Sequence, residues 1–168
     1  LQTVPYMQAM MRETEKLTDE DMVDRVAARI GRQQVFRRQR QPEFVAIISE
    51  SVLHQGIGGP EVMGDQLAYL LEAAAKRHIT IRVVPNSIGG HEGLAGPFVR
   101  LRFAERPDVV MEATRTSDIF LEDPRDMAYY DRVETDVLAA ALEEDLSIKL
   151  IAGAARDRDQ EASWHDRS

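Results

Sequence analysis

Hydrophobic residues recur at helical spacing in several stretches of the chain. The first long stretch covers residues 18–38 and opens with Thr18, whose hydroxyl is suited to cap a helix with an acidic first turn. The second covers residues 60–78 and opens with a proline, which is favoured at the first helical position. The third covers residues 124–151, as one helix or two, and opens after the cap Asp123 with Pro124 at the first helical position. A shorter apolar segment, residues 6–11, predicts one or two further turns.

Short runs rich in apolar and β-branched residues predict four or five strands between these helices. They cover residues 44–48, 80–85, 98–104, 109–113 and 119–121. The three that follow one another from residue 80 favour an antiparallel meander. If Phe103 faces Val109, the apolar side chains of strands 98–104 and 109–113 gather on one face, because side chains alternate between the faces of a sheet. Arg100 would then lie opposite Glu112 on the other face.

These elements predict an α+β fold with a small, mainly antiparallel sheet of about four to five strands and with N-terminal, central and C-terminal helices. A length of 168 residues agrees with one domain, which we expect over residues 1–155. It would consist of a helical arm (1–41), a sheet with an inserted helix (42–122) and C-terminal helices (123–155). The polar and charged tail, residues 156–168, is expected to be disordered.

Composition narrows the classes of function. The chain has no cysteine, which excludes disulfides, thiolate catalysis and iron–sulfur clusters, and its four histidines leave little for a metal site. We therefore expect no metal and no cofactor. The net charge of -8 argues against direct binding of nucleic acid. No run approaches the roughly 18 apolar residues of a membrane span, and the first residues lack a signal-peptide pattern, so we expect a cytoplasmic protein.

Charged side chains of the predicted sheet are the first candidates for a ligand site. Arg82, Arg100 and Arg102 would project from neighbouring strands together with Glu112, away from the core. Guanidinium groups fixed on a sheet are suited to hold a carboxylate or phosphate of a small ligand. The competing interpretation is cross-strand ion pairing, above all between Arg100 and Glu112.

The glycine-bearing connection of residues 86–96 is a second candidate, because long loops between strands often carry function. Within this connection, the adjacent residues His91 and Glu92 have the chemistry of an acid–base or ligand pair. The simpler interpretation is an exposed histidine in a solvated turn. His54, after the first strand, is either a pocket residue or the surface end of that strand. The sequence contains no recognisable catalytic triad, carboxylate dyad or metal-ligand motif, which disfavours a hydrolase or metalloenzyme.

Several segments resemble, in their order along the chain, those of a known family. They are Ser49-Glu50-Ser51-Val52-Leu53, Gly58-Gly59-Pro60-Glu61-Val62-Met63, Gln66-Leu67, Ile81-Arg82-Val83-Val84-Pro85 and His91-Glu92-Gly93-Leu94-Ala95-Gly96-Pro97-Phe98. They resemble the domain of unknown function that follows an XRE-type helix-turn-helix in actinobacterial, antitoxin-like transcriptional regulators. The similarity covers nearly the whole chain. Two positions depart from it: His54 stands where the family is usually arginine-like, and Gly64 replaces a better helix former.

The resemblance implies the ligand-sensing and oligomerisation domain of a transcription regulator whose helix-turn-helix half is absent from this chain. Such a protein would form a homodimer, because a symmetric pair matches two operator half-sites. It would contact DNA only through that missing N-terminal half. Family members are often encoded beside a small partner protein, so we expect either a small-molecule effector or a small protein partner.

Two alternatives to this regulator stay open. The first is a stand-alone, cofactor-free enzyme of small-molecule biosynthesis, a cyclase or isomerase derived from the same domain. Its acid–base candidates would be His91, Glu92, His54 and Glu112. The second is a pure dimerisation or protein-interaction module. The family itself supplies no catalytic residues to carry over, which favours a protein that is not an enzyme.

Overall fold

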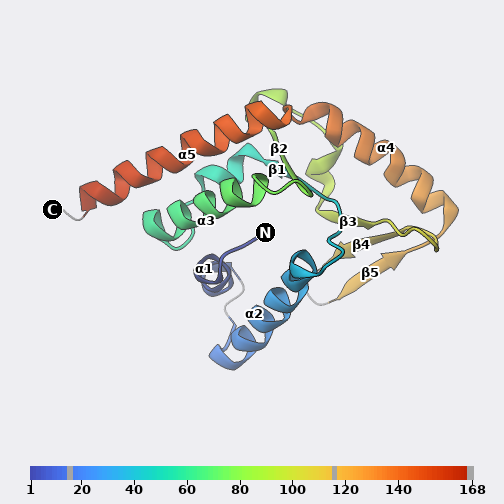
Figure 1. The fold of residues 1–168 in the computed structure, drawn as a ribbon, viewed down its shortest axis with the longest axis horizontal. Helices are drawn as coiled ribbons and strands as arrows, with labels where there is room; N and C mark the ends of the chain where they lie inside the picture. The colour runs from blue at the N-terminus through green and yellow to red at the C-terminus, as the bar shows by residue number, and fades with distance from the viewer. Residues whose placement is uncertain (15–16, 115–116, 166–168) are drawn as a thin grey trace. The chain divides into compact units, whose positions relative to one another are not determined.

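A computed structural model describes residues 1–14, 17–114 and 117–165 (Figure 1). These residues contain five α-helices and two small sheets, of two and three strands, so the predicted α+β class is confirmed. The strands number five, but they form two sheets instead of one. The chain divides into two compact units: unit 1 is Leu1–Val83 with Leu142–Ser168, and unit 2 is Val84–Ala141.

Unit 1 is a two-stranded sheet with four helices. Its elements are α1 (Val4–Thr14), α2 (Asp19–Gln33), β1 (Phe44–Ser49), α3 (Gly59–Ala74), β2 (Ile79–Val84, which ends in unit 2) and α5 (Glu144–His165). Helices α3 and α5 pack side by side (Figure 1). Alternate residues of β2, Ile79, Ile81 and Val83, are buried in a core that includes Leu67 of α3 and Ile151 of α5.

The ends of the helices in unit 1 follow local signals that the sequence contains. Thr18 caps α2, and its Oγ1 accepts a hydrogen bond from the Asp21 amide at 3.2 Å. Gly58 precedes α3 with a left-handed backbone (φ 70°), and a Cβ there would lie 2.8 Å from the Cβ of Ala9 on α1. Glycine is therefore the residue that allows α1 to approach the start of α3.

The last helix corrects the expectation of a disordered tail. Helix α5 continues to His165, so residues 156–165 are helical, and residues 166–168 of the expected tail lie outside the described residues. At its other end, the fully buried Ser147 connects α5 to the sheet, because its Oγ accepts a hydrogen bond from the Val83 amide at 2.9 Å.

Unit 2 is an antiparallel sheet with a helix packed on it. The strands β3 (Phe98–Leu101), β4 (Val109–Ala113) and β5 (Asp118–Leu121) pair in that order, and α4 (Pro124–Ala140) follows. Asp123 caps α4 by accepting a hydrogen bond from the Arg125 amide at 2.8 Å, which confirms the cap expected from the sequence.

The register of the β3–β4 hairpin differs by two residues from the one predicted. Leu101 pairs with Val109, and Arg100 pairs with Val110 instead of Glu112. The prediction was wrong because β3 ends at Leu101, so residues 102–108 belong to the connection. A shift of two residues keeps each side chain on the same face of the sheet.

The face of this sheet that α4 covers is not the one predicted to be the core. The covered face carries Arg100, Glu112 and the fully buried Val110. The opposite face, here called the outer sheet face, carries Val99, Leu101, Val109 and Met111 of the expected apolar set, together with Phe120 of β5. Its members Val99, Leu101 and Phe120 are 42%, 39% and 59% exposed. The periodicity identified the two faces, but the position of α4 decided which one is covered.

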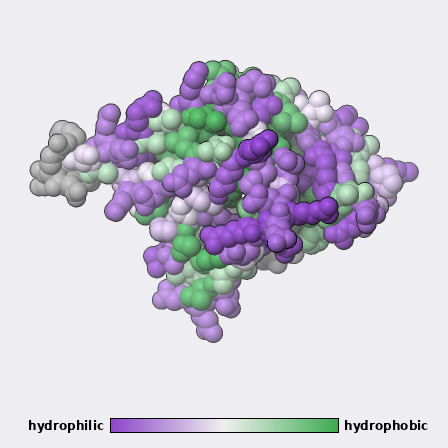
Figure 2. Space-filling view, in the orientation of Figure 1, coloured by the Kyte–Doolittle hydropathy of each residue, from purple (hydrophilic) through white to green (hydrophobic). Residues whose placement is uncertain are grey.

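The molecular face seen in Figure 2 is mostly hydrophilic, with hydrophobic residues visible in small groups between the charged ones. Within the described ranges, no helix combines the length and the apolar character needed to cross a membrane.

Candidate functional site

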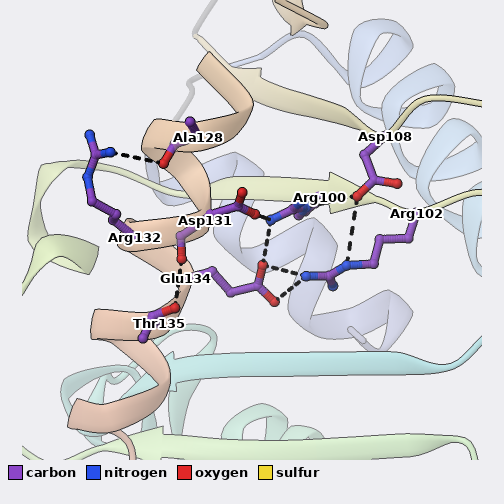
Figure 3. Close-up of polar contacts among 8 residues, drawn as sticks. All are labelled: Arg100, Arg102, Asp108, Ala128, Asp131, Arg132, Glu134 and Thr135. Atoms are coloured by element: carbon purple, nitrogen blue, oxygen red, sulfur yellow. Dashed lines mark hydrogen bonds and ion pairs between the residues drawn. The ribbon is translucent and has the colours of Figure 1, made fainter. Parts of the chain in front are cut away.

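Arg100 on β3 is held by three carboxylates of unit 2 (Figure 3). Its Nη1 lies 2.5 Å from Asp131 and 3.1 Å from Glu134, both on α4, and its Nε and Nη2 donate to Asp108 at 3.2 and 3.1 Å. Burial by itself lowers the pKa of Arg100, but hydrogen bonds to Asp131 and Asp108 and the charges of Asp131 and Glu134 outweigh it and raise the pKa above its usual value. Arg100 is therefore a fixed cation.

Arg102 joins the same network from the end of β3. Its Nη2 donates to both carboxylate oxygens of Glu134, at 2.8 and 2.6 Å, and its Nε lies 3.9 Å from Asp108. The two arginines thus have carboxylate partners from their own unit. This geometry agrees with the ion-pair interpretation, although the partners are Asp108, Asp131 and Glu134 and not the predicted Glu112.

Glu112 on β4 is instead the partner of a tyrosine on α4. The phenol of Tyr130 donates a hydrogen bond to the Glu112 carboxylate. Burial, together with this hydrogen bond and the negative charge of Glu112, raises the pKa of Tyr130 to about 12. At neutral pH the phenol is therefore a permanent donor, and it fixes the position of the carboxylate.

A pocket of about 360 Å³ lies over this pair, and we call it the tyrosine pocket. Its wall consists of three parts. They are Glu92 and residues 95–98 of the loop and the start of β3, residues 112–114 at and after the end of β4, and Tyr129, Tyr130 and Val133 of α4. In this lining the Tyr130 ring contacts the rings of Phe98 and Tyr129. The Phe98 and Tyr130 centroids are 4.9 Å apart, and the Tyr129 and Tyr130 rings meet edge to face at 5.4 Å.

A second, more open pocket of about 400 Å³ shares Glu92 and Ala95 with the tyrosine pocket. Gly90, His91 and Asp136 complete its lining. The Glu92 amide donates to Asp136 at 3.0 Å, which attaches the loop to α4. The Nδ1 atom of His91 is buried and has no hydrogen-bond partner among the described residues. The loop predicted to be functional therefore contributes to both pockets.

The remaining predicted residues, Arg82 and His54, lie in unit 1 and line neither pocket. Arg82 is on β2, which belongs to the other sheet, so the prediction that it neighbours Arg100 was wrong. Its Nε donates to the Leu142 carbonyl at 2.8 Å and its Nη2 to Glu143 at 3.0 Å. The His54 side chain is 53% exposed, and its Nε2 lies 4.0 Å from Glu50. Of the four acid–base candidates, His91, Glu92 and Glu112 line these two adjoining pockets and His54 does not.

In a comparison with protein families, the model "Domain of unknown function (DUF5753)" matches residues 1–153. The chain belongs to this family. The match confirms the resemblance to a domain of unknown function, and it covers nearly the whole chain, as the sequence predicted. Neither a curated protein nor a solved structure matches the chain.

Sequence reasoning missed the aromatic part of this DUF5753 site. Neither Tyr129 nor Tyr130 was predicted to be a site residue, and Tyr130 is buried on α4. The adjacent tyrosines in a helix that begins directly after the last strand are the signal that was available. Among the residues that the structure describes, no group of three or more histidine and acidic side chains is arranged to hold a metal ion.

Proposed function

We propose that this DUF5753 chain is the ligand-sensing and oligomerisation domain of a cytoplasmic, XRE-type helix-turn-helix regulator of the actinobacterial, antitoxin-like kind. Its DNA-binding half would lie outside this chain. The observation that carries the proposal is the tyrosine pocket, whose volume of about 360 Å³ falls in the range usual for small-molecule sites.

The construction of the pocket supports a sensing role. Its wall comes from a loop, a strand and a helix, so a bound molecule would contact all three at once. A ligand shifts a conformational equilibrium only if it binds one arrangement better than another. A pocket assembled from three elements favours such a difference in affinity, because its ligand contacts depend on how these elements are placed.

The charge of the chain and its outer sheet face support the other parts of the proposal. A net charge of -8 suits a domain that leaves DNA contacts to a separate half. The exposed Val99, Leu101 and Phe120 form an apolar surface whose burial against a second copy would be favourable. A symmetric dimer would present two DNA-binding halves to two operator half-sites.

The test uses the full-length protein from its natural source. Its intact mass and N-terminal sequence establish whether a helix-turn-helix precedes Leu1. Operator affinity is then measured by fluorescence anisotropy on the DNA upstream of its own gene, with and without the low-molecular-mass fraction of a cell extract.

The pocket is blocked in this assay with Ala95→Trp, since Ala95 lines it, and Ala104→Trp in the exposed β3–β4 connection is the matched control. We expect the extract to change the operator affinity of the wild type and of Ala104→Trp, and not that of Ala95→Trp. A natural chain without a DNA-binding half, or an operator affinity that no extract changes, would contradict the proposal.

A further inference from the structure

We propose that the tyrosine pocket selects an organic cation, a ligand whose ammonium group lies between Glu112 and the aromatic rings. This inference rests on the proposed ligand-sensing function and names the chemistry of its ligand. The proposed ligand is positively charged, whereas the arginines of the predicted sheet suggested a negatively charged carboxylate or phosphate.

The charges around the pocket are the first evidence for a cationic ligand. Among the described residues, its lining includes two carboxylates, Glu92 and Glu112, and no lysine or arginine. Of the described arginines near the pocket, Arg100 and Arg102 are paired with Asp108, Asp131 and Glu134, and Arg132 lies over the Tyr129 ring. An anion bound beside Glu112 would be repelled by its carboxylate, whereas a cation there would compensate the negative charge.

The aromatic rings carry the second step. The π face of a tyrosine or phenylalanine attracts a cation within about 6 Å of its centroid. Phe98, Tyr129 and Tyr130 all line the pocket, and contacts with Phe98 and Tyr129 hold the Tyr130 ring in place. An arginine of the chain already illustrates this attraction, because the guanidinium of Arg132 lies 5.7 Å from the Tyr129 centroid.

The state of Glu112 carries the third step. Within the residues that the structure describes, its carboxylate accepts one hydrogen bond, from the Tyr130 phenol. A carboxylate has two oxygens with about four acceptor positions, so it retains capacity for an ammonium donor. The Tyr130 phenol is neutral, so it orients the Glu112 carboxylate without cancelling the negative charge. An aromatic wall beside a carboxylate is the arrangement that binds ammonium ions through cation–π and charge-assisted contacts.

The test compares three probes of the same ring and similar size at neutral pH: benzylamine as a cation, benzyl alcohol as a neutral molecule and benzoate as an anion. Binding to the intact chain is measured by isothermal titration calorimetry. We expect benzylamine to bind with a Kd of about 1 mM or lower, and benzyl alcohol and benzoate to bind at least about tenfold more weakly.

Variants assign this preference to the pocket. Glu112→Gln should weaken benzylamine binding about tenfold or more, and Tyr129→Leu, at a residue 46% exposed, should weaken it without disturbing the core. Glu122→Gln removes the same charge from an exposed carboxylate outside the pocket lining and should change little. Circular dichroism checks that each variant is folded, and Tyr129→Leu decides the result if Glu112→Gln does not fold.

The outcomes separate this inference from the proposed function. If benzyl alcohol or benzoate binds as tightly as benzylamine, and Ala95→Trp abolishes that binding, the cation inference is overturned while the pocket remains a ligand site. If benzylamine does not bind, or if its affinity is the same in the wild type, Glu112→Gln and Tyr129→Leu, the inference is also overturned. In each case the regulator proposal is still decided by its own operator assay.

Discussion

The phenol of Tyr130 on α4 donates a hydrogen bond to the carboxylate of Glu112 on β4. This contact connects the helix to the middle strand of the three-stranded sheet of unit 2. It also places a negative charge in the wall of the tyrosine pocket, next to two further rings. One interaction thus contributes both to the stability of unit 2 and to the chemistry that we assign to its pocket.

The raised pKa of Tyr130 makes stability depend on pH in the alkaline range. The pKa is about 12 in the folded protein, against an ordinary value of 10.0, so on alkalinisation the unfolded chain loses this proton first. The contribution of Tyr130 is complete below pH 10 and is lost between about pH 10 and pH 12. Urea unfolding of the wild type and Tyr130→Phe measures it. We expect the wild type to lose more stability than the variant over this range, and parallel pH curves would contradict the assignment.

Removing the guanidinium of Arg100 should destabilise the protein. Arg100→Ala leaves Asp108, Asp131 and Glu134 without their shared partner, and two of these carboxylates are largely buried, with exposed side-chain fractions of 27% for Asp108 and 23% for Glu134. We expect a loss of about 1 to 3 kcal/mol in the free energy of unfolding. The control is Arg125→Ala on the exposed surface of α4, which should cost less than about 0.5 kcal/mol. Equal losses in the two variants would show that the ion pairs contribute nothing.

Ser147→Ala should weaken the connection between α5 and β2. The substitution removes the acceptor of the Val83 amide, which lies in the core and has Ser147 Oγ as its partner at 2.9 Å. A buried donor without a partner costs about 1 to 3 kcal/mol. The control is Ser163→Ala, at an exposed serine of the same helix whose Oγ donates to the Asp159 carbonyl. Hydrogen exchange at the Val83 amide reports the effect directly, and unchanged protection there would refute this role.

Gly58→Ala should be more harmful than Gly56→Ala, although both glycines precede α3. Gly58 has a φ of 70°, and a Cβ there would lie 2.8 Å from Ala9 Cβ and from Val62 Cγ1. Nothing lies within 4 Å of a Cβ at Gly56. Thermal unfolding should show a loss of more than about 1 kcal/mol for Gly58→Ala and little change for Gly56→Ala. Similar melting temperatures would contradict this explanation.

Local signals predicted most of the secondary structure. Thr18, Pro60 and the pair Asp123-Pro124 marked the starts of three helices, because capping depends on residues that are adjacent in sequence. The division into two sheets was not predicted. It depends on which strands pair across long separations, and the apolar runs of β1 and β2 look much like those of the other strands.

The candidate site was predicted in part. The loop with His91 and Glu92 lines the two pockets, and Glu112 lines one of them. The partners of Arg100 were missed because Asp131 and Glu134 come from a helix about thirty residues away, and no local pattern identifies the strand that this helix will cover. Tyr130 was missed because a buried aromatic residue on a helical stripe has the same pattern whether or not it lines a pocket.

Amide chemical-shift mapping shows whether the tyrosine pocket is the ligand site of this domain. Benzylamine is added to the isotope-labelled chain, and each backbone amide is followed by NMR. We expect the shifts to concentrate in residues 92–98, 112–114 and 129–133, which form or adjoin the lining of the pocket. Saturable shifts confined to unit 1, or none at all, would contradict it.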